Sequence, residues 1–287
     1  MPGINLTGAP NERDYVLGRG RVYLARLDPS TGLPDVNGYR DVGNSPEFTI
    51  SVTVEDLRHK NSRSCVKFTD KRFVVSQEIG IGFKLDETRN FQNLADFFSG
   101  QTSTYDNPHD TTHTDVVISV DTHLGAWYEL RNAAGLREYN LDAAGLVYTI
   151  EKDAVTDVLL VEGTDYEIDE QLGLIRFLPT ATNIAEGDTS QWTISTGATS
   201  ANDVDEVDAL TRAVVEGACL FIQDNAGDCG QKVEFRFHRV SLSADGDLAM
   251  IGDDVATMAF KGVAEINNSV PDVSKVLTVR TYDPMVA

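Results

Sequence analysis

Alternation of apolar and polar residues with a period of two runs through much of this chain. In residues 47–54, the apolar side chains of Phe48, Ile50, Val52 and Val54 alternate with polar ones. Successive side chains of a β-strand point to opposite faces, so the pattern predicts a strand with one buried and one wetted face. The same pattern recurs at residues 79–85, 232–238, 256–266 and 275–282. A chain patterned in this way folds around sheets.

The second faces of two of these strands carry distinctive residues. Gly80 and Gly82 alternate with Ile79 to Leu85, which leaves one face bare. Such glycines are expected where another backbone comes close or where a sheet bends. In residues 232–238 the second face is polar, and we expect its His238 to be a surface or subunit-interface residue.

One segment before residue 100 has helical spacing. Its apolar residues fall on one face and form the predicted helix core: Phe91, Leu94, Phe97 and Phe98. Asn90 or Thr88 is suited to cap its start, and Gly100 to end it. A weaker helical pattern lies at residues 203–211. Together these patterns predict a mostly-β protein with one main helix, built as sandwich or barrel sheets.

The charge is unevenly spread along the chain. The 287 residues hold 24 basic and 45 acidic side chains, a net charge of -21. Residues 1–110 hold 13 basic and 15 acidic residues (-2), residues 111–204 hold 4 and 16 (-12), and residues 205–287 hold 7 and 14 (-7). Polar stretches rich in turn-forming residues flank the middle third. We therefore expect an inserted acidic β-rich domain at 112–203 within a parent domain of 1–111 and 204–287; two consecutive domains would also explain the pattern.

The inserted segment also has the pattern of strands and turns. Strands are predicted at 158–162, 166–168 and 174–178, joined by hairpin-like connections. Its two tryptophans, Trp127 and Trp192, are expected in the core, with sugar stacking as the alternative.

Composition excludes several classes of function. A chain this acidic is poorly suited to gripping nucleic acid or an anionic membrane surface. Its 41% hydrophobic residues argue against disorder. No secretory signal or membrane span is expected from the sequence. Cys65, Cys219 and Cys229 are expected to be buried free thiols.

Motifs that carry chemistry are weak in this sequence. His109 and His113 are four residues apart but lie in a stretch rich in Pro and Thr, where we expect a solvated loop and no metal site. Asp224 and Asp228 resemble a fragment of a calcium loop, yet the alternate ligands are missing and a turn is expected. We expect no enzymatic activity and no cofactor.

Several short patterns occur in the order found in one protein family. These are residues 17–25, the turn Gly43-Asn44-Ser45-Pro46, residues 54–62, the helix at 91–100, and residues 240–254 with Asp245-Gly246-Asp247. The chain resembles the major tail tube proteins of long-tailed bacteriophages. The matching segments cover about the first 100 and the last 70 residues. The acidic insert departs from a minimal tube subunit, and Ala244 stands where the family often has proline.

The resemblance implies a two-sheet β fold with no catalytic role. Six subunits would form a ring lined by a continuous β-barrel, and rings would stack into a tube in the virion, assembled in the host cytoplasm. The tube would surround a tape-measure protein, meet tail terminator and baseplate proteins, and conduct DNA without binding it specifically. The implied subunit-interface residues are Gly18, Gly20, Gly43, Asn44, Ser45, Gly80, Gly82, Asp245, Gly246 and Asp247.

Other functions remain open at this point. A tail terminator or baseplate tube component would share the fold. A carbohydrate-binding or adhesin-like module is suggested by the strands, the two tryptophans and the acidic insert, and a β-sandwich hydrolase is a third alternative. We expect the insert to project outward, because the like charge of a whole ring would otherwise oppose assembly.

Overall fold

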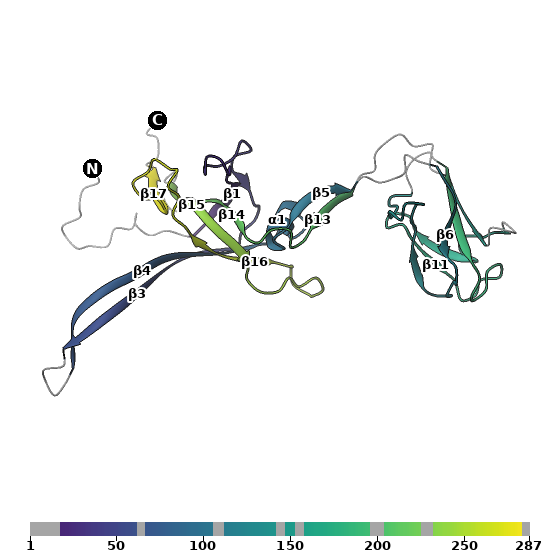
Figure 1. Cartoon of the computed structure of the whole chain (residues 1–287), viewed down its shortest axis with the longest axis horizontal. Coiled ribbons are helices and arrows are strands. Elements are labelled where there is room, and N and C mark those ends of the chain that lie inside the picture. Colours follow the sequence, from purple (N-terminus) through teal and green to yellow (C-terminus); the bar gives the residue numbers. More distant parts are fainter. Residues whose placement is uncertain are drawn as a thin grey trace. The chain divides into compact units, whose positions relative to one another are not determined.

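The regular structure of the described residues consists of antiparallel strands and one short helix (Figure 1). A computed structural model describes residues 18–61, 67–105, 112–141, 147–152, 158–195, 204–224 and 232–282. The chain divides into unit 1, Met1–Thr102 with Val207–Ala287, and unit 2, Ser103–Glu206. Unit 2 therefore lies within the sequence of unit 1. The domain boundaries predicted at 111/112 and 203/204 fall on or next to residues outside the described part of the chain.

Unit 1 is organised around one eight-stranded sheet. Its strands are β1 (Gly20–Arg26), β2 (Arg40–Asp41), β3 (Glu47–Asn61), β4 (Phe68–Leu85), β14 (Val215–Asp224), β15 (Lys232–Ala244), β16 (Met258–Ala264) and β17 (Leu277–Tyr282). Their order is β2-β1-β14-β15-β16-β4-β3, and β17 pairs with β15. A separate two-stranded ribbon joins β5 (Gln101–Tyr105) to β13 (Val204–Asp208). The weaker helix expected at 203–211 is therefore wrong, because its first residues pair as strand β13.

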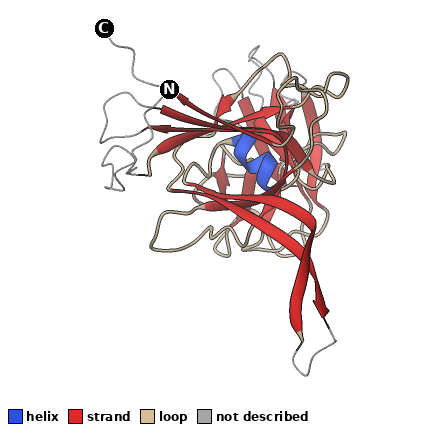
Figure 2. Cartoon of the chain, turned by 90° about the vertical axis from the view of Figure 1, so that its left-hand side faces the viewer, coloured by secondary structure: helices blue, strands red, loops and turns tan. Residues whose placement is uncertain are grey.

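The large sheet folds over its own core (Figure 2). Phe48 of β3 stacks on Phe221 of β14 with ring centroids 4.3 Å apart, although three strands separate β3 from β14 in the sheet. Phe83, Phe237 and Phe260 are buried in the same core. The described strands do not close into a barrel, since β2 and β3 remain as the two ends of the sheet. One folded, open sheet thus provides the mostly-β architecture.

Helix α1 (Phe91–Phe97) begins at the predicted cap. The Asn90 side chain accepts hydrogen bonds from the backbone N–H groups of residues 92 and 93. Phe97 is buried in the core, and Leu94 packs against it. Phe91 and Phe98, however, are 42% and 40% exposed, so they do not belong to the buried face that was predicted. The helix is short, and its inward face is shared with two buried polar residues whose role is described below.

Gly100 was predicted to end the helix, where glycine commonly adopts a positive φ. In the structure Ser99 has this conformation, with a φ of 49°, and Gly100 has a different role. A Cβ on Gly100 would lie 2.3 Å from the carbonyl oxygen of Asp208, so the residue permits a close approach between two chain segments.

Unit 2 contains two small sheets with their own core. One sheet has the order β10 (Tyr166–Asp169), β11 (Leu174–Phe177), β7 (Trp127–Glu129). The other has the order β6 (His113–Ser119), β12 (Ser190–Ser195), β8 (Val147–Lys152), β9 (Val158–Leu159). The β10–β11 hairpin is as predicted. The connection expected between 158–162 and 166–168 is not a hairpin, because β9 pairs with β8 instead.

The two tryptophans of unit 2 differ in environment. Trp192 is 1% exposed and its indole N–H donates to the carbonyl oxygen of Arg131 at 2.9 Å. Trp127 is 50% exposed, with the Arg176 guanidinium 5.6 Å from its ring centroid. The core prediction is thus confirmed for Trp192 and wrong for Trp127, which lies on the last strand of a three-stranded sheet.

Candidate functional site

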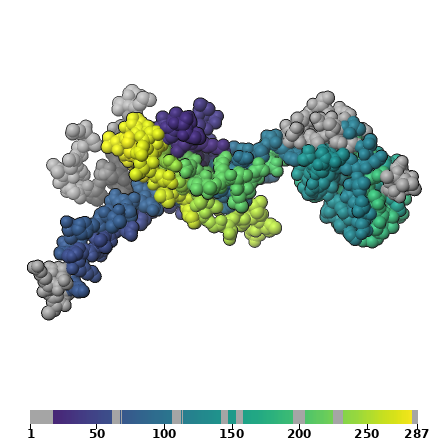
Figure 3. Space-filling view, in the orientation of Figure 1, coloured from purple at the N-terminus to yellow at the C-terminus, as the bar shows by residue number. Residues whose placement is uncertain are grey.

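Strands β3 and β4 form a long hairpin that leaves the body of unit 1 (Figures 1 and 3). They pair with each other from the Glu47–Lys84 pair to the turn, but β16 pairs with β4 only over residues 79–85. The part formed by residues 51–61 and 67–78, here called the arm, is therefore a two-stranded ribbon from the Thr53–Glu78 pair to the turn. Both of its outer edges carry backbone groups that no described strand pairs.

The arm exposes a set of large apolar side chains. Val52 is 67%, Leu57 64% and Phe73 45% exposed, and the set is completed by Val54, Val74 and Val75. Val52 and Val54 lie on one face, whereas Leu57 lies on the other, opposite Phe73 in the ladder. The buried face predicted for residues 48–54 is wrong for its outer half, because no described part of the chain covers it. Several large apolar side chains exposed on one short segment suggest an interaction site.

Charged pairs along the arm hold its two strands in register. Asp56 accepts hydrogen bonds from Arg58 at 2.9 Å and from Arg72 on the opposite strand at 2.7 Å. The hydrogen bond from Arg58 is the main reason that the pKa of Asp56 lies below its usual range. His59 and Asp70 form a second cross-strand pair at 2.6 Å. An isolated two-stranded hairpin is marginal in water, so these pairs alone make a weak support for an arm of this length.

The two glycines of β4 lie at the base of the arm. A Cβ on Gly80 would lie 2.6 Å from Ser51 Oγ, and one on Gly82 would lie 2.8 Å from Thr49 Oγ1. The Thr49 hydroxyl donates to the carbonyl oxygen of Gly82 at 3.2 Å. The face left bare by these glycines is therefore partly filled by hydroxyl groups of the neighbouring strand β3.

The remaining predicted interface residues lie at two other places in unit 1. Gly43 has a φ of 91°, and Asn44 donates from its backbone to Glu87 at 3.3 Å. Ser45 donates to the carbonyl oxygen of Glu47 at 3.0 Å. Hydrogen bonds to Glu87 and Glu47 of the same chain therefore hold this turn in place.

Gly18 and Gly20 precede and begin β1. A Cβ on Gly20 would meet the carbonyl oxygen of Ile222 at 2.5 Å, so a neighbouring strand explains this glycine, while Gly18 has open space around it. Residues Asp245, Gly246 and Asp247 form an exposed turn after β15, with Asp245 paired to Lys261 at 3.0 Å. The structure brings the predicted interface residues to separate turns and strand ends, and no single site gathers them.

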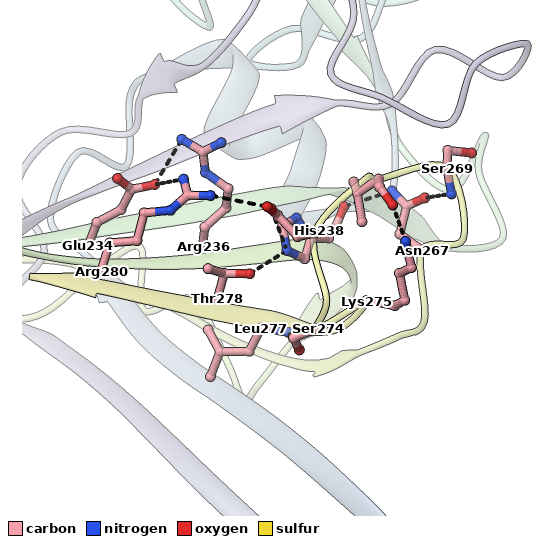
Figure 4. Close-up of polar contacts among 12 residues, drawn as sticks. Glu234, Arg236, His238, Asn267, Ser269, Ser274, Lys275, Leu277, Thr278 and Arg280 are labelled. Carbon is pink, nitrogen blue, oxygen red and sulfur yellow. Dashed lines mark hydrogen bonds and ion pairs between the residues drawn. The ribbon is translucent and has the colours of Figure 1, made fainter.

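A buried polar network fastens β17 to β15 (Figure 4). Glu234, 7% exposed, forms an ion pair with Arg236 at 2.8 Å and accepts a hydrogen bond from the Tyr282 hydroxyl. His238 is 4% exposed, so its prediction as a surface residue is wrong. The residues of the face expected to be wetted are enclosed by side chains of β17, which pairs with β15, and of the segment before it.

His238 does not have the geometry of a catalytic base. Its Nε2 lies 2.9 Å from Thr278 Oγ1 and 3.5 Å from an Asp272 carboxylate oxygen, so both partners meet the same ring nitrogen. A histidine that acts as the base of a catalytic triad contacts the nucleophile through one ring nitrogen and an orienting carboxylate through the other. Burial lowers the pKa of His238, which favours the neutral ring. The network serves to position β17.

The other sequence candidates contribute no visible chemistry. Within the described ranges, no cluster of three or more metal-ligating side chains occurs. His109 and Asp228 lie outside the described residues, as do Cys65 and Cys229, and the side chain of His113 is not described. Cys219 is buried, and burial raises the pKa of its thiol to about 12, as expected of an inert structural cysteine. No described helix is long and apolar enough to span a membrane.

Comparison with known proteins gives a family. Residues 15–275 match the family described as "Protein of unknown function UCP028589". The chain belongs to this family. A search of curated proteins found no match. The matched range includes the whole of unit 2 and the arm, so both features lie within the extent of the family.

The arm was missed as a site by sequence reasoning, although a signal was present. Strands β3 and β4 have 15 and 18 residues, whereas typical strands have about five or six. The available clue was the long interval, residues 55–78, between the alternating segments 47–54 and 79–85, which contains apolar residues such as Leu57 and Phe73.

Proposed function

We propose that this chain is a structural subunit of a bacteriophage tail tube. The observation that carries the proposal is the arm, whose apolar side chains and edges no described part of the same chain covers. Burying such surface against a neighbouring subunit would remove it from water and complete its hydrogen bonding. The kind of assembly, a phage tail tube, is proposed from the resemblance of this sequence to tail tube proteins in residues 17–25, 43–46, 91–100 and 240–254.

The charge of the arm suits a partner made of the same chain. Residues 51–78, which contain the arm and its turn, hold six basic and four acidic side chains, a net +2 in a chain of -21. The remaining residues thus carry -23. A positive arm approaching the negative body of another copy is electrostatically favourable, and this attraction offsets part of the like-charge repulsion within a ring.

The open sheet supports the same arrangement. It ends in β2 and β3, so each subunit has free sheet ends that can join neighbours. In the proposed assembly, the folded sheets of six subunits line a ring, and the rings stack into the tube of the virion. The proposed partners are other copies of the chain, a tape-measure protein inside, and terminator and baseplate proteins at the ends. DNA passes without specific binding, and the chain has no catalytic role.

Unit 2 is proposed to project from the outside of the tube. It holds most of the acidic excess, with -12 in residues 111–204. Placing that charge outward separates it from the copies in the same ring and exposes it to screening by salt. A density map that placed residues 120–195 in the lumen would contradict this part of the proposal.

Electron microscopy of the purified full-length chain tests the proposal. We expect rings or tubes of uniform diameter, whose formation rises steeply with protein concentration. Single rings that never stack would favour a terminator or baseplate component. A chain that remains monomeric at every concentration and salt level would refute the tube subunit.

A second candidate function rests on Trp127. This half-exposed ring lies beside an open hollow whose lining includes Glu162, Glu167 and Asp169. An exposed aromatic ring next to hydrogen-bonding carboxylates suits the stacking and hydroxyl recognition of a sugar. Glycan-array binding by the full chain that disappears in Trp127→Ala but persists in Trp192→Phe would support it; an array without signal would remove this candidate.

A further inference from the structure

A pocket in unit 1 brings three arginines together. It has a volume of about 260 Å³, and Arg26 of β1, Arg40 of β2 and Arg212 contribute to its lining. Leu24 and Leu242 add apolar surface. Small-molecule pockets are usually about 300 Å³ or more. This pocket therefore suits a compact group.

The three guanidinium groups differ in how they are satisfied. Arg40 donates to the buried Asp96 at 2.5 Å and to the buried Asn93 at 2.6 Å, which explains why these polar residues occupy the inner face of α1. Arg212 lies 3.9 Å from the same carboxylate, which is beyond hydrogen-bond distance. Arg26 donates to the neutral side chain of Gln92 at 3.2 Å. Arg26 and Arg212 thus retain donor groups that could meet an anion.

The other carboxylates in the lining have partners of their own. Asp35 accepts from the backbone and side-chain amides of Asn37 at 3.0 and 3.1 Å. Glu216 accepts from Arg239 at 2.7 Å. These contacts reduce the capacity of Asp35 and Glu216 to neutralise the two arginines.

Electrostatics points in the same direction as the geometry. Burial lowers the pKa of Arg212, and the positive charge of Arg26 lowers it further, against the opposing effect of Asp96. Two cations that repel each other at a partly buried site would both be stabilised by an anion between them.

We propose that this pocket binds a carboxylate, held by the guanidinium groups of Arg26 and Arg212. Arginine presents paired N–H donors that match the two oxygens of a carboxylate. The methylene groups attached to the carboxylate would then lie against Leu24 and Leu242. The carboxylate comes either from a small free acid or from an acidic side chain of a second copy. The inference stands on the pocket alone and does not rest on the tube proposal.

Thermal unfolding of the full chain with succinate tests the binding site. We expect succinate to raise the melting temperature with a saturating dose dependence, while sodium chloride at the same ionic strength does not. Arg26→Gln and Arg212→Gln are each expected to weaken the apparent affinity about tenfold or more, because each removes a charge-assisted contact. Arg21→Gln, on the same strand β1 but outside the pocket lining, is the matched control and should respond like the wild type.

Two results would overturn the proposal. One is a wild-type chain that succinate stabilises no more than chloride does. The other is an undiminished succinate response in the variants. Arg26 is exposed, so the Arg26→Gln variant should fold. Its response to succinate therefore tests the proposal even if the Arg212→Gln variant does not fold.

A second measurement identifies the source of the carboxylate. Sedimentation of the full chain is compared with and without succinate at constant ionic strength. If succinate and Arg26→Gln both reduce self-association, the natural ligand is an acidic side chain of a second copy. If succinate binds and self-association is unchanged, the ligand is a free acid, and the pocket is a small-molecule site.

Discussion

Removing the apolar pair at the middle of the arm should abolish assembly without unfolding the subunit. Leu57 and Phe73 face each other across β3 and β4 and are 64% and 45% exposed. In a single copy, the double substitution Leu57→Ser with Phe73→Ser loses one cross-strand pair, worth roughly 0.2–1 kcal/mol. The core of unit 1 contains neither residue. The melting transition of the monomer should therefore change little.

The effect on assembly is larger because the exposed part of each side chain would be buried there. Full burial of such a side chain stabilises by roughly 1.5–3 kcal/mol. Scaling by the exposed fractions of 64% and 45% gives roughly 1–2 kcal/mol for Leu57 and roughly 0.7–1.4 kcal/mol for Phe73. The sum of roughly 1.7–3.4 kcal/mol corresponds to a loss of about 20- to 300-fold in affinity for each subunit contact.

Analytical ultracentrifugation over a range of concentrations measures this loss, with electron microscopy to identify the species. The matched control is Val36→Ser with Val273→Ser, which changes two fully exposed valines outside the arm, 102% and 105% exposed. The control should assemble like the wild type. Assembly of the arm variant at wild-type concentrations would show that the arm does not form the contact. Loss of assembly in both variants would show that surface valines in general matter, which would equally refute the specific role of the arm.

Three further predictions concern the subunits themselves. Phe97→Ala should destabilise unit 1 by roughly 3–5 kcal/mol, whereas Phe91→Ala should cost much less because its ring is 42% exposed; urea unfolding compares them, and equal effects would contradict the face assignment. In Asp165, burial raises the pKa, but the hydrogen bonds of Asn183 and of backbone N–H groups outweigh it and lower the pKa to about 2. Unit 2 should therefore lose roughly 2 kcal/mol of stability as the pH falls from about 4 to about 2, and Asp165→Asn should abolish this dependence in acid-unfolding curves. Gly173→Ala should destabilise unit 2 strongly, since the residue has a φ of 61° and its Cβ would lie 1.8 Å from the carbonyl oxygen of Glu138; an unchanged melting temperature would refute that backbone geometry.

Local patterns predicted the local structure of this chain well. The turn signal before Leu174 gave the β10–β11 hairpin, and Asn90 caps α1 because its side chain can reach the first free N–H groups. These features depend on residues close in sequence, so one sequence is sufficient to see them. The burial of Phe97 follows for the same reason, as it lies three residues after Leu94 and so on the same face of the helix.

Features that depend on distant segments were not predictable in this way. Alternation assigned Glu234 and His238 to a wetted face, yet β17 lies close to that face and supplies Thr278 and Tyr282 as partners. The arginine pocket likewise joins β1, β2 and a loop after β13, which no local pattern connects. The period-two pattern indicates that the two faces of a strand differ in polarity. It does not indicate which other element of the fold contacts each face.

The arm shows how far this limit extends. Its exposed apolar side chains do not keep to one face, since Val52 and Val54 lie on one face and Leu57 on the other, and no described part of the chain covers them. Apolar side chains that no described part of the chain covers, on a segment with a net +2 in a chain of -21, suit a partner that is negative. Another copy of the chain has that property. If copies of the chain supply that cover, the arm and the acidic excess are two sides of one contact, and high salt should weaken assembly by screening it even though the apolar part of the contact is unaffected.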